Sequence, residues 1–237
     1  MVDIDRDRSP ERARQDYCKA ILQEGEGKPV KPSDVARRLG VSRASVSKLA
    51  HELSRRGLIR DLGGGQLQLT AKGRKLGLDM VRRHRVVETF LHRALGVPLD
   101  RLHAEAERIE HSISDDVAQR LEHLLGHPQY DPHGDPIPGS GATTRRDAPL
   151  GQAQLGAKLR VTRILDRDRD AVRALARAGV LPGALIVLDA IDTRRAKLRV
   201  GRGRSTLTPA AASAVRVERV ERDTRSARAG RSRAGKR

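Results

Sequence analysis

The residues best suited to bind a ligand lie in the stretch HAEAERIEHS, residues 103–112. At about 100° per residue, a helix places His103, Glu107 and Glu110 on one face, with His111 at its edge. Carboxylates and imidazoles packed this closely on a buried face repel one another unless a cation lies between them. The stretch therefore predicts a metal site.

A second pair of candidate ligands precedes this stretch. His84 and Glu88 are four residues apart on a helix predicted over 71–95, so their side chains share a face. Further helices are predicted over 99–110 and 114–125. These helices carry few aromatic residues, and we expect them to pack against a second copy of the chain in a homodimer.

The N-terminal part must position these groups and has a pattern of its own. A helix is predicted over 10–24. Ser33 is expected to cap a short second helix that ends before Gly40, and Ser42 a third that runs to about Arg56.

Alternating residues around Gly63, Gly64 and Gly65 then predict a two-stranded hairpin. Helix, turn, helix and hairpin together indicate a winged helix-turn-helix, whose third helix would enter the major groove of DNA. The predicted DNA-binding residues are small polar, small apolar or cationic residues near helix starts: Ser33, Ser42, Arg43, Ala44, Ser45, Ser47 and Lys48.

The charge balance agrees with a polyanionic partner. The chain has 48 Lys and Arg against 30 Asp and Glu, a formal charge of +18, so double-stranded DNA is the predicted partner. With one Phe, two Tyr and no Trp, the chain has few aromatic side chains that could stack on bases or anchor it in a membrane. No long apolar run or secretory signal is found, and a single cysteine fits the cytoplasm.

The C-terminal third changes to a pattern of short strands around one helix. This pattern is typical of a small β-barrel. The strands are predicted over 158–164, 182–191, 196–203 and 214–220, and the helix over 170–178. The predicted fold class is therefore a mainly α N-terminal part followed by a small β-barrel.

Several motifs resemble one known family. The winged helix-turn-helix, RRHRVVETFL, HAEAERIEH and HGDPIPG are similar to the diphtheria toxin repressor family of metal-dependent transcriptional regulators. LARAGVLPGALIVL and RVGRGRSTLTPAAASAVRV resemble the SH3-like domain that those regulators share with a ferrous-iron transport accessory protein. The resemblance covers nearly the whole chain to about residue 221.

The resemblance implies two ligand sets. Those of the main site match Asp16, Glu107, Glu110 and His111. Those of the ancillary site of the iron-responsive branch match His84, Glu88 and His103.

The resemblance also bears on the choice of metal. Iron-type members carry Met and Cys where this chain has Asp16 and Glu107, and hard oxygen donors favour Mn(II). The manganese pattern has an acidic residue one turn after the aspartate, where this chain has Lys19. This places Lys19 where a second ion would bind, so the resemblance leaves a two-metal cluster open.

The resemblance and the composition together predict five segments. They are a DNA-binding domain over 1–76, a metal-binding and dimerisation domain over 77–145, a linker over 146–154, an SH3-like domain over 155–221 and a disordered basic tail over 222–237. Five of the eleven prolines and several glycines fall in 126–152, so this whole region is also expected to be a linker.

The resulting hypothesis is a Mn(II)-activated repressor of metal-uptake genes that binds a palindromic operator. Two alternatives stay open: an Fe(II)-responsive repressor of iron-uptake genes, and a metal-independent DNA-binding or nucleoid protein. An enzyme is not expected, because H-E-x-x-H is missing and the inverted motif fails where Glu107 replaces its first histidine.

Overall fold

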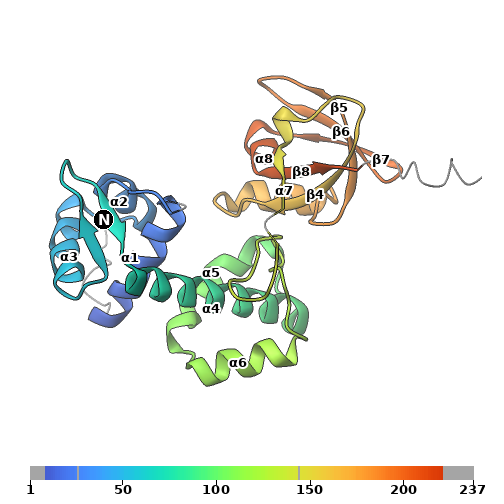
Figure 1. Cartoon of the computed structure of the whole chain (residues 1–237). Helices are drawn as coiled ribbons and strands as arrows, with labels where there is room; N and C mark the ends of the chain where they lie inside the picture. Colours follow the sequence, from blue (N-terminus) through green and yellow to red (C-terminus); the bar gives the residue numbers. More distant parts are fainter. Residues whose placement is uncertain (1–8, 26, 144, 221–237) are drawn as a thin grey trace, which may run out of the picture. The chain divides into compact units, whose positions relative to one another are not determined.

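The structure is a computed structural model that describes residues 9–25, 27–143 and 145–220 (Figure 1). The chain forms two compact units. The helical unit consists of the described residues up to Val97, together with 102–131 and 136–143. The sheet unit consists of the other described residues. The predicted basic tail lies outside the described residues.

The first part of the helical unit has the predicted order of elements. It contains α1 (Pro10–Gly25), α2 (Pro32–Leu39), α3 (Arg43–Arg55) and the antiparallel strands β1 (Ile59–Asp61) and β2 (Leu67–Leu69). Gly40 ends α2 in the left-handed conformation, and Ser42 caps α3 by accepting a hydrogen bond from Ser45 N at 3.0 Å. The winged helix-turn-helix is therefore present.

The expected cap of α2 is wrong. Pro32 is the first residue of the helix and Lys31 is its N-cap, without a side-chain hydrogen bond, so Ser33 lies inside the helix. Proline is favoured at the first helical position, because it has no N–H that would need a partner there.

The second part of the helical unit contains α4 (Ala71–Leu95), α5 (Leu99–Ile109) from residue 102 onward, the short 3-10 helix η2 (Glu110–Ser112) and α6 (Asp115–Leu124). Thr70 caps α4 at its start, Gly96 ends it, and Ser114 caps α6. The helix predicted over 99–110 ends one residue earlier, at Ile109, and Glu110 and His111 lie on η2 instead of on the α-helix that their spacing assumed, because the chain tightens there before it turns toward α6.

The helix α1 packs closely against α4. A Cβ atom added to Gly77 would lie 2.8 Å from Cys18 O, so only glycine allows the two helices to approach this far. Tyr17, Cys18 and Ile21 of α1 are buried in the same core as Val46 and Leu53 of α3. This packing holds one face of α1 at a fixed depth beside α4.

The sheet unit contains a six-stranded antiparallel sheet with the order β3-β8-β4-β5-β6-β7. Its strands are β3 (Ala148–Pro149), β4 (Lys158–Ile164), β5 (Leu185–Ile191), β6 (Ala196–Val200), β7 (Gly203–Leu207) and β8 (Val215–Arg219). The 3-10 helix η3 (Leu150–Gln152) and the helices α7 (Arg169–Arg177) and α8 (Pro209–Ser213) complete the unit. Within the described residues the strand pairings do not close into a ring, so the expected barrel is an open sheet.

Two strands of this unit are absent from the sequence prediction. The strand β7 has only Leu207 buried, so its sequence GRSTL lacks the alternation that marks a strand. The strand β3 lies in the segment expected to be a linker, and Leu150 directly after it is fully buried. Both strands form because a neighbouring strand offers hydrogen bonds.

Among the described residues, no helix combines the length and the apolar character needed to cross a membrane.

Candidate metal centre

Four elements of the helical unit contribute the predicted ligands. Asp16 comes from α1, His84 and Glu88 come from α4, and the others come from α5 and η2. The structure brings all seven together in three overlapping groups, each with ligand atoms within 4.8 Å of one another. The groups are Asp16, Glu110 and His111; His84, Glu88 and His103; and His84, Glu107 and Glu110.

The first group, which we call the first cluster, joins α1 to η2. His111 Nε2 lies 2.8 Å from Asp16 Oδ1 and 3.5 Å from Glu110 Oε1. Asp16 and Glu110 are buried, and the side chain of His111 is 8% exposed. Two carboxylates and an imidazole therefore meet out of contact with bulk water.

The tautomer of His111 decides what this cluster can bind. Its Nδ1 lies 2.9 Å from Gln15 Oε1, an acceptor, so Nδ1 carries the hydrogen and donates it. The buried Nε2 has no hydrogen bond within the described part of the chain, although it lies 2.8 Å from Asp16 Oδ1. An imidazole whose Nδ1 donates to an acceptor can present Nε2 to a metal ion, and the two neighbouring carboxylates would complete such a site. The residues of the first cluster therefore fit a divalent ion.

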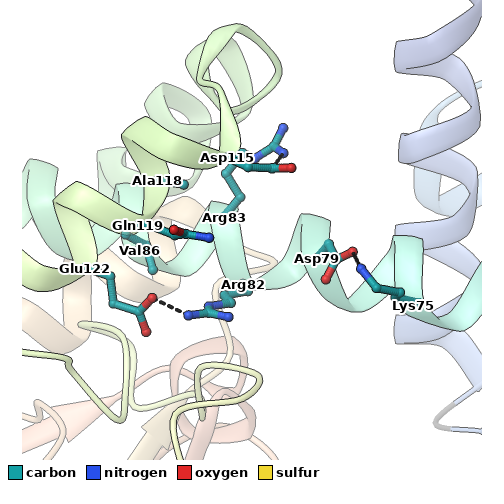
Figure 2. A pocket seen from close by; sticks show the side chains of 9 residues that line it. All are labelled: Lys75, Asp79, Arg82, Arg83, Val86, Asp115, Ala118, Gln119 and Glu122. Carbon is teal, nitrogen blue, oxygen red and sulfur yellow. Dashed lines mark hydrogen bonds and ion pairs between the residues drawn. The ribbon is translucent and has the colours of Figure 1, made fainter.

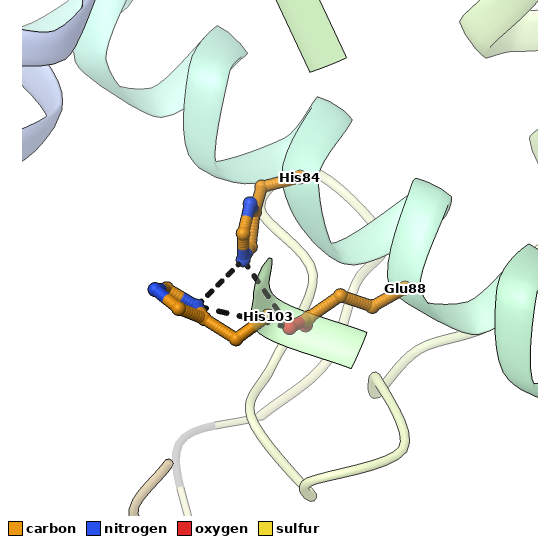
Figure 3. A group of neighbouring side chains, drawn as sticks. All are labelled: His84, Glu88 and His103. Carbon is orange, nitrogen blue, oxygen red and sulfur yellow. Dashed lines mark hydrogen bonds and ion pairs between the residues drawn. The ribbon is translucent and has the colours of Figure 1, made fainter. Parts of the chain in front are cut away.

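The second cluster consists of His84, Glu88 and His103. Figure 3 shows the three side chains pointing toward one another from α4 and α5. His84 Nε2 lies 3.2 Å from both Glu88 Oε1 and His103 Nδ1. Glu88 is 1% exposed, whereas the side chain of His103 is 49% exposed. This cluster also fits a divalent ion, and it is open to solvent at His103.

The third group has a cation already in place, and we call it the lysine cluster. Lys19 Nζ donates to Glu107 Oε1 at 2.7 Å and to Glu110 Oε1 at 2.9 Å. It also lies 3.2 Å from His84 Nδ1, which is itself 2.5 Å from Glu110 Oε2. Glu107 is thus bound by Lys19 and does not join the group around Asp16, with which it was predicted to act.

The charges of the lysine cluster stabilise one another. Burial lowers the pKa of Lys19, but the charges of Glu110 and Glu107 outweigh burial and hold this pKa above its usual value. Burial raises the pKa of Glu110, but the hydrogen bond from His84 and the charges of His84 and Lys19 lower it to about 2. Burial also raises the pKa of Glu107, and Lys19 brings it below its usual value. Both carboxylates are therefore ionised at neutral pH.

Gln15 contacts the predicted ligand His111 and was not named in the sequence analysis. A glutamine beside a predicted ligand carries no signal that would single it out. This contact depends on α1 lying beside η2, which only the folded chain shows.

The predicted DNA-binding residues gather on α3 and near it. Ser42, Arg43, Ala44, Ser47 and Lys48 are exposed, whereas Ser45 is half-buried. Ser33 is also half-buried and lies on α2. Val46 and Leu53 on the other face of α3 are fully buried. The helix therefore presents its polar residues outward from a fixed apolar base.

A groove between α4 and α6 has a volume of about 250 Å³ and lies apart from the clusters (Figure 2). Arg82 pairs with Glu122 across it, and Arg83 pairs with Asp115. Lys75 pairs with Asp79 along α4 at 2.6 Å. Since charges of both signs are already paired, the groove does not select a ligand of one charge.

A winged helix-turn-helix joined to helices with buried carboxylate and imidazole clusters defines a metal-dependent DNA-binding protein. Three family models match the chain. They are the iron dependent repressor N-terminal DNA binding domain at residues 11–61, the iron dependent repressor metal binding and dimerisation domain at 70–139, and the FeoA domain at 148–219. The chain belongs to the iron-dependent repressor family, which confirms the resemblance and the predicted order of a helical N-terminal part followed by a small SH3-like domain, whose sheet is open instead of a closed barrel. The family consists of transcriptional repressors, not enzymes.

Named relatives cover almost the whole chain. The iron-dependent repressor IdeR of Mycobacterium tuberculosis is 34% identical over 219 residues, covering 86% of this chain and 95% of the relative. The diphtheria toxin repressor of Corynebacterium glutamicum is 32% identical over 217 residues, covering 86% and 94%. A solved manganese-dependent transcriptional repressor in complex with manganese is 34% identical, with a TM-score of 0.79, and the match covers 87% of this chain and 100% of that one.

Proposed function

We propose that this protein is a Mn(II)-activated repressor of metal-uptake genes that acts in the cytoplasm and binds a palindromic operator as a homodimer. The first cluster carries the proposal. Asp16 lies on α1, in the part matched by the DNA-binding family model, whereas Glu110 and His111 lie in the part matched by the metal-binding model.

The donor types support Mn(II). Asp16 and Glu110 offer carboxylate oxygens and His111 offers an imidazole nitrogen, with no sulfur among them. Oxygen-rich sets suit Mn(II) better than softer metals. The relative described with manganese supports the same choice. Fe(II) is the second candidate, because IdeR is named iron-dependent.

The first cluster would couple metal binding to DNA binding. A bound ion supplies the positive charge that lets the carboxylates of Asp16 and Glu110 lie together. Asp16 then ties α1, which contacts α2 and α4, to the helices that follow α4. The orientation of α3 and its exposed Arg43 depends on this tie. Metal and DNA must strengthen each other's binding equally, by about 1–3 kcal/mol in typical cases.

Exposed apolar side chains support the homodimer. Leu95, Val117 and Leu124 are 61%, 43% and 70% exposed on α4 and α6. All three lie in the part matched by the family model of the metal binding and dimerisation domain. A dimer would present two copies of α3 and so match a palindrome. Analytical ultracentrifugation tests the dimer.

The test of the function is operator affinity, measured by fluorescence anisotropy on genomic fragments selected by the protein. Chelator, Mn(II), anaerobic Fe(II) and Zn(II) are compared at one salt concentration. We expect Mn(II) to tighten specific binding more than tenfold, or about 1.4 kcal/mol.

Asp16→Asn keeps the size of the side chain and removes its charge. This variant should bind DNA with chelator-level affinity in every metal. Glu105→Gln is the matched control, because Glu105 pairs with Arg108 on α5 and belongs to none of the clusters. If the wild type binds DNA with the same affinity in chelator and in metal, the protein is a metal-independent DNA-binding protein instead.

A further inference from the structure

Lys19 has surroundings that are unusual for a lysine. Its side chain is 6% exposed, and its ammonium group lies among atoms that would otherwise be metal ligands. Lysine is almost never fully buried unless it is paired. Here the pairing is with two carboxylates, Glu107 and Glu110.

The position of the ammonium group is the position of an ion. Lys19 Nζ is 2.7 Å from Glu107 Oε1, 2.9 and 3.1 Å from the two oxygens of Glu110, and 3.2 Å from His84 Nδ1. Small divalent ions lie about 2.0–2.2 Å from such oxygen and nitrogen atoms. An ion bound by the same atoms would therefore overlap the ammonium group.

His84 and Glu110 connect the lysine cluster to its two neighbours. His84 turns Nδ1 to the lysine cluster and Nε2 to Glu88 and His103. Glu110 Oε1 accepts from Lys19 and also faces His111. The three clusters form a row in which the first and the second flank the lysine cluster.

We propose that Lys19 is a tethered cation that fills the middle position of this row, so that divalent ions bind only in the first and second clusters. The inference rests on the proposed metal-dependent function and specifies the number of ions that the donor row accepts. Lys19 keeps Glu107 and Glu110 in place when metal is scarce, and it excludes a third ion from the atoms that they share with His84.

The experiment counts bound ions instead of activity. Full-length wild type and the variants Lys19→Met and Lys19→Glu are dialysed to equilibrium against Mn(II), and bound manganese is measured by mass spectrometry. Lys19→Met removes the charge and keeps an apolar stem, whereas Lys19→Glu also adds a carboxylate. We expect each variant to bind one more ion per chain than the wild type, with more spin coupling between Mn(II) ions in electron paramagnetic resonance.

Two further variants serve as controls. Lys19→Arg keeps a cation and should bind the wild-type number of ions. Lys75→Glu makes the same charge change at an exposed lysine of α4 and should add no ion. Circular dichroism checks that each variant is folded.

The outcomes separate this inference from the proposed function. Equal ion counts in wild type, folded Lys19→Met and folded Lys19→Glu would overturn the role of Lys19, and so would an extra ion in Lys19→Arg. If neither charge-removing variant folds, a spin-coupled Mn(II) pair in the wild type would overturn it, and uncoupled Mn(II) signals there would support it. If the Lys19 variants gain an ion as expected but the wild type binds DNA equally in chelator and in metal, the result would contradict the proposed function alone.

Discussion

The helical unit and the sheet unit use their buried positions differently. Among the described residues, the helical unit buries Asp16, Lys19, His84, Glu88 and Glu110 side by side. The buried polar residues of the sheet unit are His133 and Thr162, and the rest of its interior is aliphatic. The sheet unit is stabilised by apolar burial, whereas part of the interior of the helical unit consists of charged side chains.

The physical consequence concerns response to ligands. Buried charges contribute little net stability, because the cost of removing them from water offsets their attraction. They do make the free energy of unfolding depend on which ions bind beside them. We therefore expect the helical unit to respond to metal and the sheet unit to ignore it.

The largest effect is expected in the sheet unit. Leu198→Ala removes a fully buried side chain of β6 and should lower the free energy of unfolding by about 2–5 kcal/mol. Urea denaturation measures the change. Leu185→Ala, at a 51% exposed position of β5, is the control with little expected change. A loss of Mn(II) binding in Leu198→Ala would contradict the separation between the units.

Metal addition is expected to act on the helical unit alone. At a free Mn(II) concentration of one hundred times Kd, one site stabilises the folded state by about 2.7 kcal/mol. Differential scanning calorimetry with Mn(II) and with chelator should show a higher Tm for the transition that Asp16→Asn affects. If Mn(II) raises the Tm of the transition that Leu198→Ala affects by the same amount, the two units do not differ in their response to metal.

Arg43→Ala should affect DNA affinity and neither unit's stability. Arg43 is exposed near the start of α3, where a guanidinium can bind a guanine in the major groove. Loss of such a contact costs about 1–3 kcal/mol and relaxes sequence preference. Anisotropy titrations with operator and scrambled DNA measure both. Arg120→Ala on α6 is the control, and an equal loss there would assign the effect to net charge.

The smallest change concerns Cys18, which reports the opening of the helical unit. Burial raises the pKa of its thiol to about 12, above the ordinary value of 9.0. The native thiol therefore stays protonated near pH 8.5, while the unfolded thiol ionises as the pH rises toward 9. Iodoacetamide should label the native chain at least tenfold more slowly than the urea-unfolded chain. Mn(II) should slow labelling further, and fast native labelling would show that α1 is not packed as described.

Local signals predicted most of the helices correctly. Ser42, Thr70 and Ser114 cap helices because their side-chain oxygens accept from nearby backbone N–H groups. Thr70 was not singled out in advance, yet the start of α4 was still predicted from the periodicity. The cap at Ser33 was predicted wrongly, because Pro32 competes for the same helix start.

The sheet unit was less predictable at its edges. The central strand β4 alternates in its own sequence and was predicted with its observed bounds. The edge strands β3 and β7 pair with neighbours distant in the sequence or have few buried residues, so their sequences carry little periodic signal. Strand pairing is a tertiary property at such edges.

The sequence by itself determined the classes of chemistry, because residue type and helical spacing decide which side chains can share a face. It determined that carboxylates and imidazoles gather near HAEAERIEHS and that a cationic helix follows a tight turn. Only the tertiary structure decided the grouping. In the folded chain α1 approaches α4 closely at Gly77. The same packing places Asp16 beside His111, and it places Lys19 between Glu107 and Glu110. Distances between side chains on different helices depend on packing, which no single helix contains.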